Sequence, residues 1–331
     1  MINKRATFAN LVVKFGRENL LDYKVHTTSE LVTDNKYRKY GRSIYRFMDV
    51  KLQLADPKDP LSVVIFGRFV KDTEYIREQV LADGKLVADE KTLPVALSSF
   101  FCIFLAEHRM AYVPEVRNAP PLDAFGSTLE QYLRKEFTAL IDRIYRENKA
   151  ENPKFTRVNA IAGRVSPTVH IVPLPARQSV REFISRFEKI NSMTVTLIRR
   201  NNEISKGLFQ EIVKEIEPTG AVTAKLVATG GTEGLDINGT ADFVEETTES
   251  GYEDVTLKGI DKDGGVLKGG NEEFKLTADV HDALPDEALA VNLYQRFKSM
   301  ANAGQIKVGE RSAHEQSAIA AHLSSLMKAA E

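Results

Sequence analysis

Basic and aromatic side chains alternate in one short stretch near the start of the chain. Residues 36–47 read KYRKYGRSIYRF, with five Lys or Arg, four Tyr or Phe and no acidic residue. Lys and Arg neutralise phosphates and release counterions, while Tyr offers a face on which a base can stack. The stretch therefore indicates a binding site for a polyanion. The alternative is an ordinary strand whose polar face is exposed to solvent. The predicted phosphate contacts are Lys36, Arg38, Lys39, Arg42 and Arg46.

A second basic group follows the predicted strand SMTVTLIRR. Arg199, Arg200 and Lys206 lie where this strand passes into a predicted helix. The first backbone N–H groups of that helix could add to the side-chain charge in holding a phosphate. A polar connecting loop is the alternative interpretation. Four further cations of the first half could extend the basic surface: Lys14, Arg17, Arg68 and Lys71.

The net charge of −1 hides a strong asymmetry along the chain. Residues 231–290 hold 16 Asp or Glu against 4 Lys, whereas residues 1–230 hold 36 basic and 27 acidic side chains. Such a distribution attracts polyanions to the basic part and basic proteins to the acidic part. A rival function is therefore a protein-interaction module or inhibitor that uses residues 231–290. A solvated acidic hairpin explains the same composition without a partner.

A third hypothesis, a metal-dependent nuclease, also depends on the acidic segment. Asp261 and Asp263, with Glu273 and Lys275, resemble an arrangement in which carboxylates hold Mg²⁺ and a Lys orients water. In so acidic a segment such spacings also arise by chance. The six His residues show no metal-ligand spacing, and GGTEGLDINGT lacks the features of a phosphate loop. The sequence thus indicates no catalytic residue, no metal and no cofactor.

Alternating apolar residues and turn signals predict a sheet in the first half of the chain. From Leu122 the apolar period changes to three and four, which predicts an amphipathic helix of about six turns. This helix should end at RENKAENPK, and we place a domain boundary there, between residues 1–150 and 151–331. The predicted strands cover 7–16, 43–55, 62–70 and two segments of 98–116 around a turn near Glu107 and His108, with a hairpin at Asp83 and Gly84.

The second half predicts alternating strands and helices, followed by short acidic hairpins. The strands are 168–174, 192–200 and 221–230, and the helices are 179–190, with Ser179 as N-cap, and 203–217, stopped by Pro218. The hairpin strands are 235–240, 253–260 and 274–280, before two C-terminal helices over 284–304 and 314–330. The predicted class is α+β: a mixed or antiparallel sheet with a long helix, then a small α/β sandwich-like domain.

Composition limits the cellular setting of the chain. No apolar run approaches the ~20 residues that a spanning helix requires, and the first residues lack the apolar core of a secretory signal. We therefore expect a cytoplasmic protein. The single cysteine, Cys102, lies within SSFFCIFLA and should be a buried core residue.

Three stretches of the chain resemble the RexA-type phage exclusion proteins, a family of bacterial antiviral factors. They are the segment SSFFCIFLAEHRMAYVPEVRNAPPLDAFGSTLEQYL, then EFISRFEKINSMTVTLIRR, and the late helix EALAVNLYQRFKSM. They run in the family's order and span about residues 98 to 300. They are apolar patterns rather than catalytic signatures, and the basic stretch around Arg38 is not a motif of that family.

The resemblance implies a homodimeric DNA-binding protein of α+β fold with weak sequence preference. It also implies that the protein senses a signal for a membrane effector encoded beside it. We accordingly expect a non-catalytic, duplex-binding component of phage defence. The basic residues 36–46, 199, 200 and 206 agree with that expectation.

Overall fold

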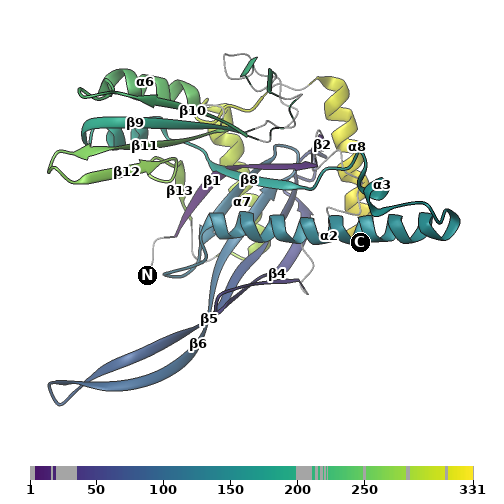
Figure 1. Cartoon of the computed structure of the whole chain (residues 1–331), viewed down its shortest axis with the longest axis horizontal. Coiled ribbons are helices and arrows are strands. Elements are labelled where there is room, and N and C mark those ends of the chain that lie inside the picture. Colours follow the sequence, from purple (N-terminus) through teal and green to yellow (C-terminus); the bar gives the residue numbers. More distant parts are fainter. Residues whose placement is uncertain are drawn as a thin grey trace.

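The computed structural model has the predicted α+β class, with two antiparallel sheets and helices packed on them (Figure 1). It describes residues 4–15, 18–19, 36–198, 211–212, 215–216, 219, 221, 223–248, 251–280, 284–309 and 312–330.

The large sheet contains nine of the described strands. Their order is β13-β1-β7-β6-β5-β4-β3, and β2 and β8 also pair with β1. The bounds are β1 Arg5–Phe15, β2 Glu18–Asn19, β3 Tyr37–Tyr40, β4 Ser43–Leu54, β5 Val63–Ala82, β6 Lys85–Phe104, β7 Arg109–Pro114, β8 Thr168–Pro173 and β13 Thr277–Asp279.

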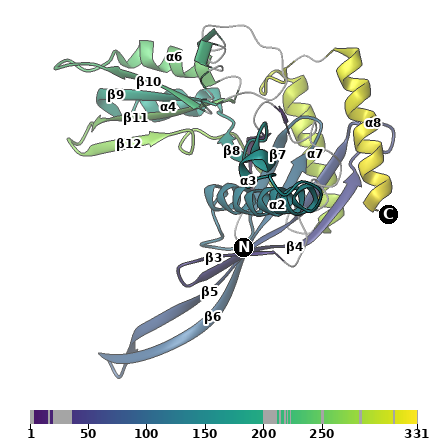
Figure 2. The ribbon, with the colours of Figure 1, turned by 45° about the vertical axis from the view of Figure 1, so that its right-hand side comes forward.

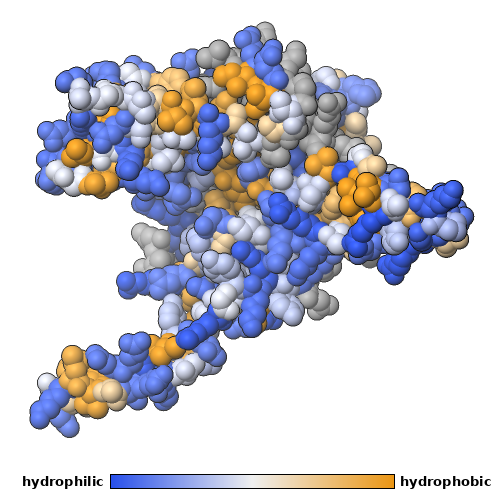
Figure 3. Space-filling model, in the orientation of Figure 1, coloured by the Kyte–Doolittle hydropathy of each residue, from blue (hydrophilic) through white to orange (hydrophobic). Residues whose placement is uncertain are grey.

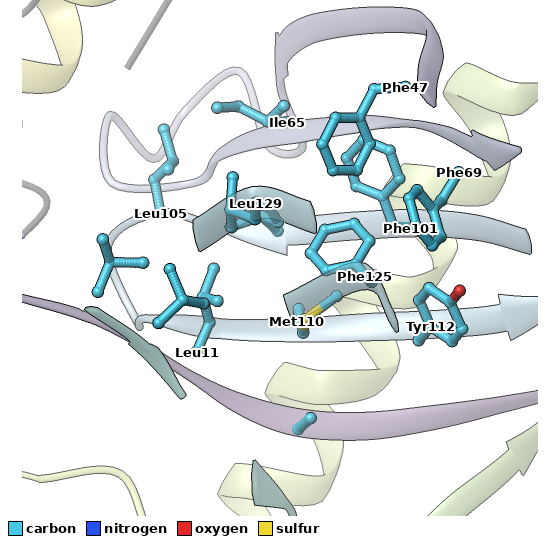
Figure 4. Packing of buried hydrophobic residues seen from close by; sticks show 14 of the residues in the cluster. Leu11, Phe47, Ile65, Phe69, Phe101, Leu105, Met110, Tyr112, Phe125 and Leu129 are labelled. Atoms are coloured by element: carbon cyan, nitrogen blue, oxygen red, sulfur yellow. The ribbon is translucent and has the colours of Figure 1, made fainter. Parts of the chain in front are cut away.

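Helices cover both faces of this sheet. The long helix α2 (Leu122–Glu151) and the C-terminal helix α8 (Ala313–Ala330) pack on one face, and α7 (Asp286–Asn302) packs on the other. Phe125 of α2 is 1% exposed and lies within 5.1 to 5.8 Å of the rings of Phe47, Phe69, Phe101 and Tyr112 (Figure 4). This aromatic group anchors α2 to the sheet because each ring presents an edge or a tilted face to its neighbour.

Strands β5 and β6 run far beyond the sheet and form a two-stranded arm (Figures 1 and 2). Each strand has 20 residues, and the predicted strand 62–70 covers only the first part of β5. The predicted hairpin turn is confirmed, with positive φ at Asp83 (47°) and Gly84 (73°). A turn of this kind suits the twist of the two strands that it joins.

The second sheet has four described strands in the order β10-β9-β11-β12, and two helices cover one face. The strands are β9 Phe187–Ile198, β10 Thr223–Thr229, β11 Glu253–Asp261 and β12 Val266–Gly270, and the helices are α4 Arg177–Ile184 and α6 Ile237–Thr248. The short helix α3 (Arg157–Ile161) follows α2 and begins with a capping box at Thr156.

Buried polar groups join the two sheets. The side-chain amide of Asn10 donates to the carbonyl of Gly251 at 2.9 Å, and the guanidinium of Arg109 lies 5.4 Å from the ring centre of Tyr252. Asn10 and Arg109 are both fully buried. The contacts hold the second sheet on the side of the large sheet where β1 and β7 pair.

The long helix ends within RENKAENPK, as predicted, but it is longer than the six turns expected from its apolar period. Helix α2 has 30 residues, more than eight turns, and continues through residues 145–151. These residues contain no helix breaker, and the first proline, Pro153, comes after the C-cap Asn152. Since only Pro removes a backbone donor and clashes with the preceding turn, the charged residues alone did not stop the helix.

The predicted helix 179–190 was wrong in both bounds. Helix α4 begins after Ala176 rather than at a Ser179 cap, and it ends at Ile184. Phe187 already pairs with Asp261 as part of β9. Phe183 and Phe187 are both buried and are spaced like neighbours on a helix. Their spacing therefore predicted a continuous helix, although pairing with β11 makes the second part a strand.

Two of the predicted acidic hairpin strands have other structures. The stretch 235–240 leads into α6, because a carboxylate oxygen of Asp236 accepts from the backbone N–H of Gly239 at 2.6 Å and caps the first turn. Strand β13 pairs with β1 of the large sheet instead of forming a local hairpin. The predicted strand 253–260 is confirmed as part of β11, and it forms a hairpin with β12, a strand that the sequence did not predict.

Strand pairing also crosses the predicted domain boundary. Both β8 and β13, which follow residue 150 in the chain, pair with β1. The helices α7 and α8 likewise pack on the large sheet. The boundary near residue 150 stays a prediction. The predicted helix 203–217 lies largely outside the described residues.

Candidate nucleic-acid interface

The basic stretch 36–46 forms a hairpin at one edge of the large sheet. Strands β3 and β4 pair in the register Tyr37 with Arg46 and Lys39 with Ile44. Gly41, with a φ of 58°, makes the tight turn between them. The stretch is thus a strand and turn at a sheet edge, a place where an extended surface meets solvent.

One face of this hairpin points to helix α2. The ammonium nitrogen of Lys36 lies 2.8 Å from a carboxylate oxygen of Glu136, and Arg38 donates to the hydroxyl of Thr128 at 3.3 Å. The hydroxyl of Tyr132 donates to the backbone carbonyl of Lys36. Burial raises the pKa of this Tyr132 hydroxyl, so it keeps the proton that it donates.

Side chains alternate along β3, so Tyr37 and Lys39 lie on the opposite face. Arg46 lies on that face opposite Tyr37, and its guanidinium is 3.3 Å from a carboxylate oxygen of Asp72. Lys39 is exposed and takes part in no ion pair among the described residues. Arg42, in the turn, is exposed in the same way.

The five cations are therefore unequal. Carboxylates already neutralise Lys36 and Arg46, whereas the described contacts of Arg38, Lys39 and Arg42 include no carboxylate. Tyr37 and Tyr40 are 59% and 68% exposed. These two exposed tyrosines and the three remaining cations can present charge, hydroxyls and aromatic faces to a ligand.

Two of the other predicted cations, Lys14 and Arg68, do not extend this surface. Lys14 is only 5% exposed. Arg68 donates two hydrogen bonds to the carboxylate of Asp286, at 2.6 and 2.9 Å, and one to Glu115 at 3.2 Å. Lys71 is half-buried at the base of the arm, and Arg17 lies outside the described residues.

Arg199, Arg200 and Lys206 also lie outside the described residues. Ile198, the last described residue before them, is buried against Val12 of β1. Strand β1 is separated from β3 by four strands of the large sheet. The site that these three cations were predicted to form stays a prediction.

Several described carboxylates of the acidic segment are neutralised by ion pairs within the molecule. Five of them pair with cations outside the segment and one with Lys275 inside it. The pairs are Asp242 and Glu245 with Arg181, Asp279 with Arg5, Asp286 with Arg68, Glu287 with Lys51, and Glu272 with Lys275.

One carboxylate of the proposed nuclease set, that of Asp261, holds the turn between β11 and β12. A carboxylate oxygen of Asp261 accepts from the backbone N–H groups of Asp263 and Gly265, at 3.0 and 2.7 Å. Lys275 makes its ion pair with Glu272. Within the described part of the chain, no three His, Cys, Asp or Glu side chains gather as metal ligands would.

Sequence reasoning missed one exposed basic surface, at the far end of α2. Six cations lie there within residues 142–165, against three carboxylates. The spacing of three between the first cations could have revealed it, because such residues share one side of a helix. The cations are Arg143, Arg146, Lys149, Lys154, Arg157 and Arg164, all exposed.

Cys102 is fully buried, as predicted, and burial raises the pKa of its thiol well above the ordinary value. None of the described helices is long and apolar enough to cross a bilayer. No protein-family model matches the chain, and a search of curated proteins finds no match either.

Proposed function

We propose that the protein binds the phosphate backbone of DNA through the β3–β4 hairpin, with little sequence preference. The observation that carries the proposal is the group of Lys39 and Arg42, both exposed, and the half-buried Arg38, on the hairpin that also exposes Tyr37 and Tyr40. Their described contacts leave the three cations without a carboxylate partner. Such cations neutralise phosphates, and exposed tyrosines can stack on bases.

The layout of the hairpin suits a duplex ligand more than a small anion. The cations are spread along a strand and a turn rather than gathered in a pocket. Contacts to phosphates position a protein on a duplex but do not read its sequence. We therefore expect weak sequence preference and a strong dependence of affinity on salt.

The resemblance to the RexA-type proteins extends the proposal. It supports a non-catalytic component of bacterial phage defence that acts as a homodimer in the cytoplasm. A membrane effector encoded nearby is the partner to which it would signal. The rival proposal remains an interaction module that uses residues 231–290 to dock a basic protein.

The test is a fluorescence-anisotropy titration of a labelled duplex at two salt concentrations. It compares the wild type with a variant in which Arg38, Lys39 and Arg42 are changed together to Glu. Salt-sensitive binding that the triple change removes supports the proposal. A wild type that does not bind at low salt overturns it and favours the interaction module.

A nuclease is tested on the same labelled duplex. The duplex is incubated with the protein and Mg²⁺ or Mn²⁺ and then analysed for cleavage. Cleavage that is lost in Asp263→Ala or Glu273→Ala would assign that activity. Intact DNA after long incubation removes the nuclease hypothesis.

A further inference from the structure

The arm formed by β5 and β6 carries apolar side chains that nothing in the described chain covers. Leu81 and Leu86, which pair across the strands beside the turn, are each 73% exposed. Tyr75 and Leu93 form a second pair on the same face, at 43% and 42%. We name these four side chains the arm face, and Figure 3 shows apolar side chains gathered near the end of the arm.

The arm is poorly suited to a polyanion. Residues 74–92 hold five carboxylates and three cations. Arg77 makes an ion pair with Asp89 across the strands. The arm thus combines apolar side chains with a net negative charge, which is the complement of an apolar surface with a positive charge.

Such a surface exists at the far end of α2, in and after helix α3. Val158, Ile161 and Val165 are 76%, 45% and 55% exposed. They lie close in the sequence to Arg157 and Arg164, within the basic surface of residues 142–165. We name the three apolar side chains the α3 patch. An ion pair between Arg157 and Asp142, at 2.5 Å, ties α3 to α2 and fixes the place of the patch.

The arm and the α3 patch of one chain lie at opposite ends of the molecule (Figure 1). The arm therefore cannot reach the α3 patch of its own chain. The arm of a second copy can. Contact between an acidic apolar arm and a basic apolar patch brings opposite charges together and buries the exposed apolar side chains of both surfaces.

The area of the arm decides how many such contacts a stable assembly needs. About nine residues of each strand project, so one face is roughly 30 Å long and 10 Å wide, or about 300 Å². One arm on one patch then buries about 600 Å² in total, below the 1,200 Å² of a small specific interface. Two reciprocal contacts reach that area, and a two-fold axis supplies both.

We propose that two copies of this chain associate through reciprocal contacts in which each arm face covers the α3 patch of the other copy. The inference goes beyond DNA binding, since it uses neither the β3–β4 hairpin nor any predicted phosphate contact. It rests on the proposed function in one respect, because it assigns an interface to the proposed homodimer. DNA binding is tested separately, because all of the tests below are made without DNA.

The first experiment measures molar mass by light scattering over a range of protein concentrations. It compares the wild type with an arm variant, Leu81→Asp with Leu86→Asp, and a patch variant, Val158→Asp with Ile161→Asp. Val266→Asp, at a valine of β12 that is 79% exposed, is the matched control. We expect a dimer for the wild type and the control and a monomer for both variants, with dissociation constants raised at least tenfold.

The second experiment identifies the surfaces that meet. Cys102 is the only cysteine and is buried, so new surface cysteines report contacts cleanly. A mixture of Leu81→Cys and Val158→Cys chains should form a mixed disulfide under mild oxidation at least tenfold faster than a mixture of Leu81→Cys and Val266→Cys chains. Each cysteine variant alone should cross-link no faster than the control mixture.

Several outcomes would overturn the proposal. A wild type that stays monomeric at about 100 µM, where even a contact of micromolar affinity would be dimeric, removes it. A dimer that persists in the arm variant or the patch variant assigns the interface to other residues. Rapid cross-linking of Leu81→Cys chains with one another shows that arm meets arm. Growth beyond a dimer shows that the contact does not close on a two-fold axis.

Discussion

The pairing of Lys36 with Glu136 and of Arg46 with Asp72 leads to a quantitative prediction for DNA binding. Each phosphate that a cation neutralises contributes about 0.9 to the slope of log affinity against log salt. Arg38, Lys39 and Arg42 together should contribute about 2.7, whereas five equivalent cations would contribute about 4.5. The two paired cations should contribute little, because their charge is already neutralised by carboxylates.

The perturbation is a double change, Lys39→Gln with Arg42→Gln, which removes charge without adding repulsion. It should lower the salt slope by about 1.8. Between 50 and 200 mM salt the wild type should then lose about 12-fold more affinity than the variant. The matched control is Lys36→Gln with Arg46→Gln, which should change the slope by less than about 0.5 because the lost cations were paired.

Anisotropy titrations of one labelled duplex at four salt concentrations give the three slopes. Equal decreases in the two double variants would refute the reasoning, since the ion pairs would then not have removed Lys36 and Arg46 from the interface. An unchanged slope in Lys39→Gln with Arg42→Gln would show that the hairpin does not touch phosphates. Far-UV circular dichroism and thermal midpoints check that both variants keep the fold.

Three further predictions concern stability. Phe125→Ala should lower the free energy of unfolding by about 3–5 kcal/mol in a denaturant titration, because removal of the buried ring leaves a cavity among four aromatic neighbours. The control Tyr40→Ala, at an exposed site, should lower it by less than about 1 kcal/mol, and equal losses in the two variants would contradict the packing argument. Arg68→Met should lower the free energy of unfolding by about 2 kcal/mol, because it leaves the carboxylates of Asp286 and Glu115 without their donor. A loss that disappears when Asp286 is also changed to Asn would confirm the pair, and an unchanged stability of Arg68→Met would refute it. Burial lowers the pKa of His170 below its ordinary value of 6.5, so the unfolded chain binds a proton that the folded chain does not, and stability should fall as pH decreases below about 6.5. His170→Gln should reduce the drop in melting temperature between about pH 7.5 and 5.5. An equal drop in both proteins would exclude His170 as the titrating group.

Local sequence patterns determined most of the regular elements near their observed bounds. The alternation in residues 7–16 and 43–55 and the helical period from Leu122 are properties of short segments. The same holds for the Asp83 and Gly84 turn and for the burial of Cys102 within an apolar run. These features depend on neighbours within a few residues, so the order of side chains is sufficient to predict them.

The tertiary structure alone decided which groups meet across long distances in the sequence. Lys36 pairs with Glu136, one hundred residues away, and no spacing rule connects the two. Residues 187–190 became strand rather than helix because β11 offered a partner, and β13 joined β1 across most of the chain. Backbone and charged groups form hydrogen bonds and ion pairs with the partners that the fold brings near. Which partners these are depends on how distant segments pack.

The acidic segment shows the same division between sequence and fold. Its composition was evident from the sequence, but its meaning was not, because Arg5, Lys51 and Arg68 reach its carboxylates from the opposite end of the chain. The arm and the α3 patch likewise became recognisable only as surfaces. Exposure of a leucine or a valine is a property of the folded molecule, since it depends on what the rest of the chain leaves uncovered.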